Sequence, residues 1–230
     1  VLTTATAADS ALVTVTSYSG ATTTMIEYGP APLTPGTGTL DVLTNDSLVL
    51  SGLSAATTYD VLIASDCSGT TGDSSSVESY SFTTLCATFT APYFQNFDAA
   101  LTAPICWDNS FGTEPWSFLA SGGSGPGFGV AGSVDHTSGS GNFAWIDASS
   151  TIGTNELITA DIDISLLSFP VVGFWILSNN TDNTAQNAIE LSYWDGAAWA
   201  LLTSYAGNDA NWVEISDTLP PTAPTTTRFR

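Results

Sequence analysis

Short segments of alternating apolar and polar residues run through the first third of the chain. A period of two with one apolar face predicts half-buried β-strands, and several short strands at this spacing are typical of a β-sandwich. Residues 1–86 are therefore predicted to form one sandwich. The alternating apolar positions are Val13 and Val15, Ile26 and Tyr28, Tyr59, Val61 and Ile63, and Tyr80 and Phe82.

The pattern changes after a short predicted linker at residues 87–92. Residues 93–230 contain aromatic-rich segments separated by wide loops of glycine and serine, and no window of the chain keeps a helical period. Because 43% of the 230 residues are hydrophobic, the chain can form two cores. The predicted fold class is all-β, with two tandem β-sandwiches.

Charge excludes several classes of function. The chain has 22 acidic residues against two basic ones, Arg228 and Arg230, and a formal net charge of −20. Such a surface repels nucleic acids and anionic membranes, and no apolar run approaches the length of a membrane span. His136 is the only histidine, and no G-x-S-x-G motif accompanies it. We therefore predict no catalytic residues and no enzyme activity.

Two segments of the first sandwich resemble fibronectin type III domains. Leu53, Thr57 and Tyr59 in residues 53–59 (LSAATTY) match the approach to that family's tyrosine corner, and residues 79–84 (SYSFTT) are similar to its closing strand. The chain departs from the family at strand B, where the family has a tryptophan and Val15 stands near that place. The resemblance implies the fold and says nothing about a ligand.

The second part of the chain resembles MAM domains in the order and spacing of several segments. That resemblance implies a jelly-roll sandwich of the kind found in extracellular adhesion proteins and as accessory modules of enzymes. It also implies that residues 189–199 form a hairpin around an Asp-Gly turn. The matching segments are residues 94–98 (FQNFD), 105–107 (ICW), 133–137 (SVDHT), 141–147 (GNFAWID), 189–199 (IELSYWDGAAW) and 212–215 (WVEI).

MAM domains continue with further strands beyond the position of residues 226–230. We therefore expect this jelly roll to be incomplete at its C-terminus and to expose an unpaired strand edge there. Either a longer parent protein supplies the missing strand, or a neighbouring chain does so by strand addition. The second possibility would make the chain a subunit of a filament or surface layer.

Three cysteines in a lysine-free β sequence suggest an exported protein, in which two of them would pair. Cys67 and Cys86 follow two neighbouring predicted strands and are the expected disulfide. Cys106 is then either a buried free thiol or an alternative partner of Cys86.

Asp98, Asp135 and Asp147 are candidate metal ligands, because the MAM resemblance brings their three segments near one end of the jelly roll. Calcium binds six to eight oxygen ligands and would relieve the repulsion between the carboxylates. The alternative is that these residues are solvated loop acids and turn caps.

The seven tryptophans suggest two roles. Trp107, Trp145 and Trp175 lie within or beside apolar runs and are predicted to be core residues. The other candidates flank turns and are predicted glycan or partner contacts: Trp116, Trp194 and Trp199.

Three acidic-hydroxyl-apolar tripeptides are possible O-glycosylation sites. Their hydroxyl residues are Ser10, Ser47 and Thr218. Such tripeptides are similar to those modified in exported proteins of some bacteria.

The sequence thus predicts an extracellular, non-catalytic adhesion or interaction module of a larger secreted or surface bacterial protein, with protein or glycan partners at the cell surface and with calcium as its possible cofactor. Two alternatives remain open. The chain could be a carbohydrate- or partner-binding accessory module of a secreted hydrolase, or a structural subunit that assembles through an open strand edge.

Overall fold

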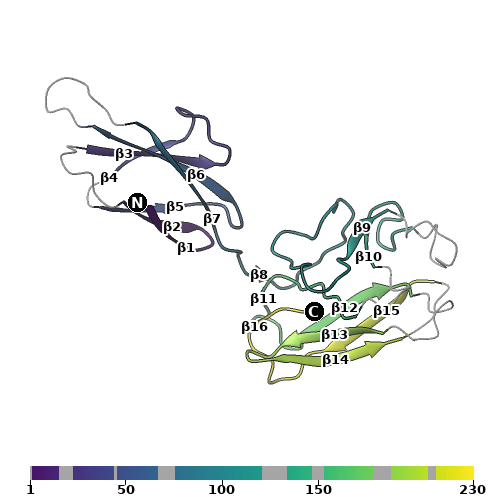
Figure 1. Cartoon of the computed structure of the whole chain (residues 1–230). Helices are drawn as coiled ribbons and strands as arrows, with labels where there is room; N and C mark the ends of the chain where they lie inside the picture. Colours follow the sequence, from purple (N-terminus) through teal and green to yellow (C-terminus); the bar gives the residue numbers. More distant parts are fainter. Residues whose placement is uncertain are drawn as a thin grey trace. The chain divides into compact units, whose positions relative to one another are not determined.

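The computed structural model describes residues 2–15, 23–43, 46–66, 76–120, 134–146, 153–178, 188–206 and 211–230. These residues form strands, turns and loops and contain no helix, so the predicted all-β fold is confirmed. The chain divides into two compact units, Val1–Ala87 (unit 1) and Thr88–Arg230 (unit 2) (Figure 1). The described part offers no helix long and apolar enough to cross a membrane.

Unit 1 contains two antiparallel sheets, one with the strand order β1-β2-β5 and the other with the order β4-β3-β6-β7. Figure 1 shows the two sheets as separate layers. The strands are β1 (Leu2–Thr6), β2 (Ser10–Val15), β3 (Thr23–Pro30), β4 (Thr39–Leu43), β5 (Ser47–Ser51), β6 (Thr58–Asp66) and β7 (Glu78–Thr83).

The core of unit 1 lies between these sheets, where the alternation of the sequence places it. Val13 of β2 and Leu50 of β5 come from one sheet, and Ile26 of β3 and Val61 of β6 come from the other; all four are fully buried or nearly so. Tyr28 and Tyr80 pack at the margin of this core. The predicted apolar faces of β2, β3, β6 and β7 are therefore confirmed.

A tyrosine ties the turn between β5 and β6. The backbone N–H of Ser54 donates to the hydroxyl of Tyr59 over 2.9 Å, and the Tyr59 ring stacks on Phe82 with centroids 5.8 Å apart. The Thr84 hydroxyl donates to the Ser54 carbonyl over 2.7 Å. This is the geometry of a tyrosine corner, as predicted from residues 53–59.

Two carboxylates hold the connection between β3 and β4. Glu27 accepts hydrogen bonds from the N–H groups of Gly36 (2.9 Å) and Gly38 (2.7 Å), which keep the pKa of Glu27 below its ordinary value. The Ser81 hydroxyl and then the Leu33 N–H lower the pKa of Asp60 in the same way. The connection therefore depends on ionised carboxylates rather than on ion pairs.

Strand β4 lies at the margin of its sheet, because among the described residues it pairs only with β3. The Asp41 carboxylate accepts the N–H of the next residue, Val42, over 2.8 Å. That N–H is thus satisfied within its own strand. A charged side chain on an edge strand is a common protection against unwanted strand pairing.

The described residues of unit 2 form nine short strands. The residues expected to be a linker include β8, which pairs in parallel with β11. The strands are β8 (Phe89–Thr90), β9 (Ser117–Leu119), β10 (Phe143–Trp145), β11 (Ile162–Asp163), β12 (Val171–Ile176), β13 (Ile189–Trp194), β14 (Trp199–Tyr205), β15 (Val213–Thr218) and β16 (Thr226–Thr227).

The C-terminal strand, defined here as residues 226–230, is bonded on both of its sides. Toward β13, Trp194 N–H donates to the Arg228 carbonyl over 3.0 Å, and Ser192 and Arg230 exchange two backbone bonds of 2.8 and 2.9 Å. Toward β11, Thr227 pairs with Ile162. The strand order of this layer is therefore β14, β13, the C-terminal strand, β11, β8. Residues 226–230 are therefore not themselves an open edge; that the jelly roll lacks a later strand stays a prediction.

A second layer, the β12–β15 pair, covers one side of this five-strand layer. Val172 and Phe174 of β12 pack against a buried cluster that includes Leu191 and Tyr193 of β13 and Phe229 of the C-terminal strand. The predicted hairpin at residues 189–199 is confirmed as β13–β14. Unit 2 is thus a second β-sandwich in tandem with the first.

A disulfide joins Cys86 to Cys106. The predicted Cys67–Cys86 pair is therefore wrong, and the alternative partner considered for Cys86 is the correct one. Spacing could not distinguish the two pairs, because each closes a loop of about 20 residues and the entropy of closure depends only on loop length. Cys67 lies outside the described residues.

The Tyr59→Phe substitution should lower the stability of unit 1 by about 1 to 2 kcal/mol, because it removes one hydrogen bond and leaves the Ser54 N–H without a partner. All seven tryptophans lie in unit 2. Urea unfolding followed by far-UV circular dichroism should therefore show the loss, while the tryptophan fluorescence transition stays unchanged. Tyr80→Phe, at the margin of the same core, is the matched control; an equal loss there would contradict the role of the Tyr59 hydroxyl.

Unit 1 should also lose stability in acid. A carboxylate whose pKa is lowered by folding stabilises the folded state fully above its unfolded pKa, near 4.5 for Glu27, and this stability is lost as the pH falls through the lower folded pKa. We expect Glu27→Gln to flatten the dependence of the unit 1 melting temperature on pH between about 6 and 3. Glu78→Gln on exposed β7 is the control, and an unchanged slope in Glu27→Gln would refute the assignment.

Candidate functional site

The outer surface of the β12–β15 pair carries an exposed aromatic side chain. Val172, Phe174 and Ile176 point inward from β12, so the alternate residues point outward. In register, Val171 lies opposite Thr218, Gly173 opposite Ser216 and Trp175 opposite Glu214. We call this surface the Trp175 face; its residues are Val171, Gly173, Trp175, Glu214, Ser216 and Thr218.

Trp175 is 43% exposed, which contradicts its prediction as a core residue. The apolar run of residues 170–176 places large side chains on both sides of β12, and only one side meets the second layer. Phe174 takes the half-buried position and packs against the cluster that contains Leu191 and Tyr193. Trp175 is consequently left on the surface.

His136 lies flat on Trp175. The ring centroids are 3.7 Å apart with an interplanar angle of 14°, and Trp212 meets His136 edge to face at 6.1 Å. The Trp212 indole N–H donates to the Val134 carbonyl over 3.0 Å, which fixes the loop that carries His136. The single imidazole therefore forms part of an aromatic group at one end of the Trp175 face.

Two of the three predicted metal ligands, Asp98 and Asp135, come together at Ser138. The Ser138 hydroxyl lies 3.0 Å from Asp98 Oδ1 and 3.2 Å from Asp135 Oδ2, and the Ser138 N–H also donates to Asp135. Asn96 donates to the other oxygen of Asp98 over 2.9 Å. Asp135 is almost fully buried. Asp147 lies outside the described residues.

These contacts make Asp98 and Asp135 ties of the loop that carries Ser138. Calcium needs six to eight oxygen ligands, and among the described residues no group of three acidic, histidine or cysteine side chains could hold a metal ion. The carboxylate oxygens already accept bonds from protein N–H and O–H groups. Calcium binding therefore stays a prediction of the sequence.

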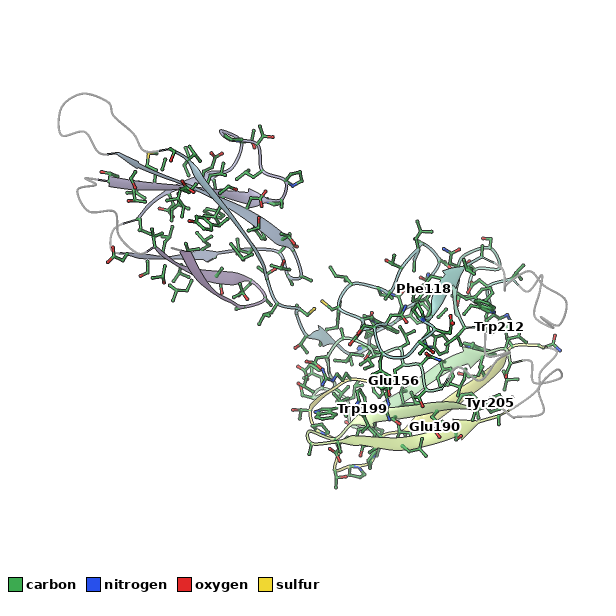
Figure 2. The ribbon with its side chains drawn as sticks, viewed as in Figure 1. Phe118, Glu156, Glu190, Trp199, Tyr205 and Trp212 are labelled. Carbon is green, nitrogen blue, oxygen red and sulfur yellow. The ribbon has the colours of Figure 1, made fainter. Side chains whose placement is uncertain are left out.

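Trp194 and Trp199 form an arginine–tryptophan cluster with the two basic residues. Their rings meet edge to face at 5.5 Å. The Arg228 Cζ lies 5.3 Å from the Trp194 ring, and the Arg230 Cζ lies 4.9 Å from the Trp199 ring. Arg230 Nη1 also forms an ion pair of 2.8 Å with Glu156; Figure 2 labels Glu156 and Trp199, the two residues that Arg230 connects.

The cluster fixes the C-terminal strand, because the two arginines belong to that strand and both tryptophans belong to the neighbouring hairpin. A guanidinium over an indole ring contributes about 0.5 to 2 kcal/mol. Arg228 also acts on Asp108, whose pKa is lowered first by the Ser110 hydroxyl and N–H and then by the Arg228 charge. The sequence predicted the two tryptophans as contacts but missed their arginine partners.

Trp116, the third predicted contact, is half-buried. Its backbone N–H donates to the Asn109 side chain over 2.8 Å, and its carbonyl accepts from the same side chain over 2.7 Å. Its buried indole nitrogen has no hydrogen-bond partner within the part of the chain that the structure describes. Trp116 is thus less exposed than expected for a residue that contacts a glycan or protein partner.

The three possible O-glycosylation residues all lie in strands. Ser10 begins β2 and donates to Asp9 over 3.1 Å, while Ser47 is exposed at the start of β5. Thr218 is exposed at the end of β15, on the Trp175 face. Whether these hydroxyls carry glycans stays a prediction.

No protein-family model matches the sequence, and no curated protein does. Among solved structures, the chain is similar to a computationally redesigned β-sandwich protein, with 23% identity over 37% of this chain and 92% of that one and a TM-score of 0.32. It is also similar to the tandem CBM22-1–CBM22-2 domain of Xyn10C from Paenibacillus barcinonensis, with 16% identity over 96% of this chain and 68% of that one and a TM-score of 0.38.

The loop tie can be tested with Ser138→Ala. This change removes the hydroxyl between Asp98 and Asp135 and should lower the stability of unit 2 by about 1 to 3 kcal/mol, since one carboxylate is buried. Urea unfolding followed by tryptophan fluorescence measures the loss, with the exposed Ser140→Ala as the control. The loss should be equal in calcium and in chelator. A calcium-dependent rise in the melting temperature that disappears in Asp135→Asn would show instead the metal site that the sequence predicts.

Proposed function

We propose that the chain is a non-catalytic, extracellular interaction module of a larger secreted or surface protein. Unit 1 would be a fibronectin type III-like domain, since its described residues form seven strands in the sheets β1-β2-β5 and β4-β3-β6-β7 and a tyrosine corner at Tyr59. Unit 2 would be a MAM-like jelly roll. The Cys86–Cys106 disulfide supports an oxidising compartment.

The observation that carries this proposal is the Trp175 face. Large aromatic residues are enriched where proteins bind partners, because they bury much area and lose little side-chain entropy. Trp175 stands exposed on a rigid strand and is held in place by His136, so its position is organised before any ligand arrives. The neighbouring hydroxyl and carboxylate groups of β15 can orient a ligand.

The contacts of the histidine and the two arginines support a binding role over catalysis. His136 stacks on Trp175, and its neighbour Asp135 is bonded to Ser138 rather than to the imidazole. Arg228 and Arg230 are engaged by Trp194, Trp199 and Glu156. These groups stabilise the fold. An adhesion protein and a secreted hydrolase could both use such a module in the same way.

The proposal predicts Trp175-dependent binding. The fluorescently labelled full chain would be applied to an array of extracellular-matrix proteins and polysaccharides, beside the variant Trp175→Ala and the control Leu201→Ala, which alters an exposed side chain on β14. We expect retention on at least one array member, reduced roughly tenfold or more by Trp175→Ala alone. Hydrolase activity that is lost in His136→Ala would overturn the proposal, as would binding that ignores Trp175.

A further inference from the structure

The Trp175 face combines two kinds of side chain in neighbouring rows. Along β12 the outward positions are apolar, with Val171 57% exposed and Trp175 43% exposed. Along β15 the outward positions are Thr218, Ser216 and Glu214, which offer two hydroxyls and a carboxylate. An apolar surface beside a few polar groups is the usual composition of a small-molecule or glycan site.

Gly173 lies between Val171 and Trp175 on the outward side of β12. Its backbone does not have a positive φ, so the conformation of β12 does not require glycine there. A Cβ at this position would lie 3.2 Å from the Ile215 carbonyl oxygen and 3.7 Å from the Ser216 side chain. Glycine inside a strand often marks a close approach of another backbone, and here the Ile215 carbonyl of β15 makes that approach. The middle of the face therefore carries no side chain from β12.

The length of the Trp175 face suits a chain-like ligand. Val171 and Trp175 are four residues apart, which corresponds to about 13 Å along a strand. The indole at one end is fixed by the His136 stack, and the hydroxyl row runs beside the whole length. A polyhydroxylated chain lying along β12 would place an apolar ring face on the indole and its hydroxyls against β15.

Charge selects the class of ligand. With a formal net charge of −20, the chain repels anionic ligands. A cationic ligand would need several carboxylates, and the face contains only Glu214. A neutral ligand with many hydroxyl groups meets neither obstacle, and serine, threonine and carboxylate side chains are suitable hydrogen-bond partners for it.

We propose that the Trp175 face binds a neutral polysaccharide chain, which lies along β12 across Gly173 and contacts Trp175. This inference rests on the proposed function as a binding module and names the ligand class of the same face. The part of the Trp175 ring that His136 leaves exposed supplies the apolar contact. Ser216 and Glu214 supply hydrogen bonds from the neighbouring strand.

The test is affinity electrophoresis and calorimetry of the full chain with soluble neutral polysaccharides, namely xylan, glucomannan and mixed-linkage β-glucan, and with anionic alginate for comparison. We expect binding to at least one neutral polymer and none to alginate. Trp175→Ala should weaken binding roughly tenfold or more. Ser216→Arg, which places a long charged side chain opposite Gly173 in the middle of the face, should also abolish it.

Two further variants identify the ligand class. Glu214→Gln removes the charge but keeps a hydrogen-bonding group, so a neutral ligand should lose no more than about threefold in affinity, whereas a cationic ligand would lose much more. Leu201→Ala is the matched surface control and should bind normally. Circular dichroism of every variant establishes that the fold is intact.

The outcomes separate this inference from the proposed function. Absence of binding to every neutral polysaccharide, together with Trp175-dependent retention on a matrix protein, would overturn the inference and leave the proposed function standing. A Trp175-dependent dimer in sedimentation would also overturn it, since the face would then bind a second copy. Loss of both kinds of binding would refute both proposals.

Discussion

The pairing of residues 226–230 between β13 and β11 is the constraint on which unit 2 depends. This segment lies between the β13–β14 hairpin and the β11–β8 pair and forms backbone hydrogen bonds with both. It is therefore the strand that connects these two pairs into one layer. It also delivers Phe229 to the core. The last residues of the chain therefore complete the surface on which β12 packs, and β12 in turn presents Trp175.

The scarcity of cations determines how the acidic side chains are accommodated. Both guanidiniums serve the C-terminal strand, so carboxylates elsewhere rely on N–H and O–H donors. Glu27 and Asp60 hold the β3–β4 connection in this way, and Asp195 accepts the N–H groups of Ala197 and Ala198 at the β13–β14 turn. Local hydrogen bonds thus replace ion pairs across both units, and many loops have an ionised carboxylate as their anchor.

Sequence reasoning succeeded where one strand face alone determines the outcome. The alternation around Val13, Ile26 and Val61 predicted the core of unit 1, and the Asp-Gly pair predicted the β13–β14 hairpin. It failed where the burial or the bonding partner of a residue depends on which distant segment of the chain packs against it. Trp175 was assigned to the core because both faces of β12 are apolar, and Cys86 had two partners at nearly equal separation. Residues 226–230 give no local sign that both of their edges are paired.

The hydrogen bond from Val42 to Asp41 on the edge strand β4 bears on how such units behave beside one another. Because the Val42 N–H donates to Asp41, this N–H is not available to pair with a strand of another molecule. Domains joined in tandem are at a very high local concentration, where an unpaired strand edge can pair with the edge of a neighbouring domain. The Asp41 contact therefore removes one N–H group of β4 from those available to a neighbouring domain.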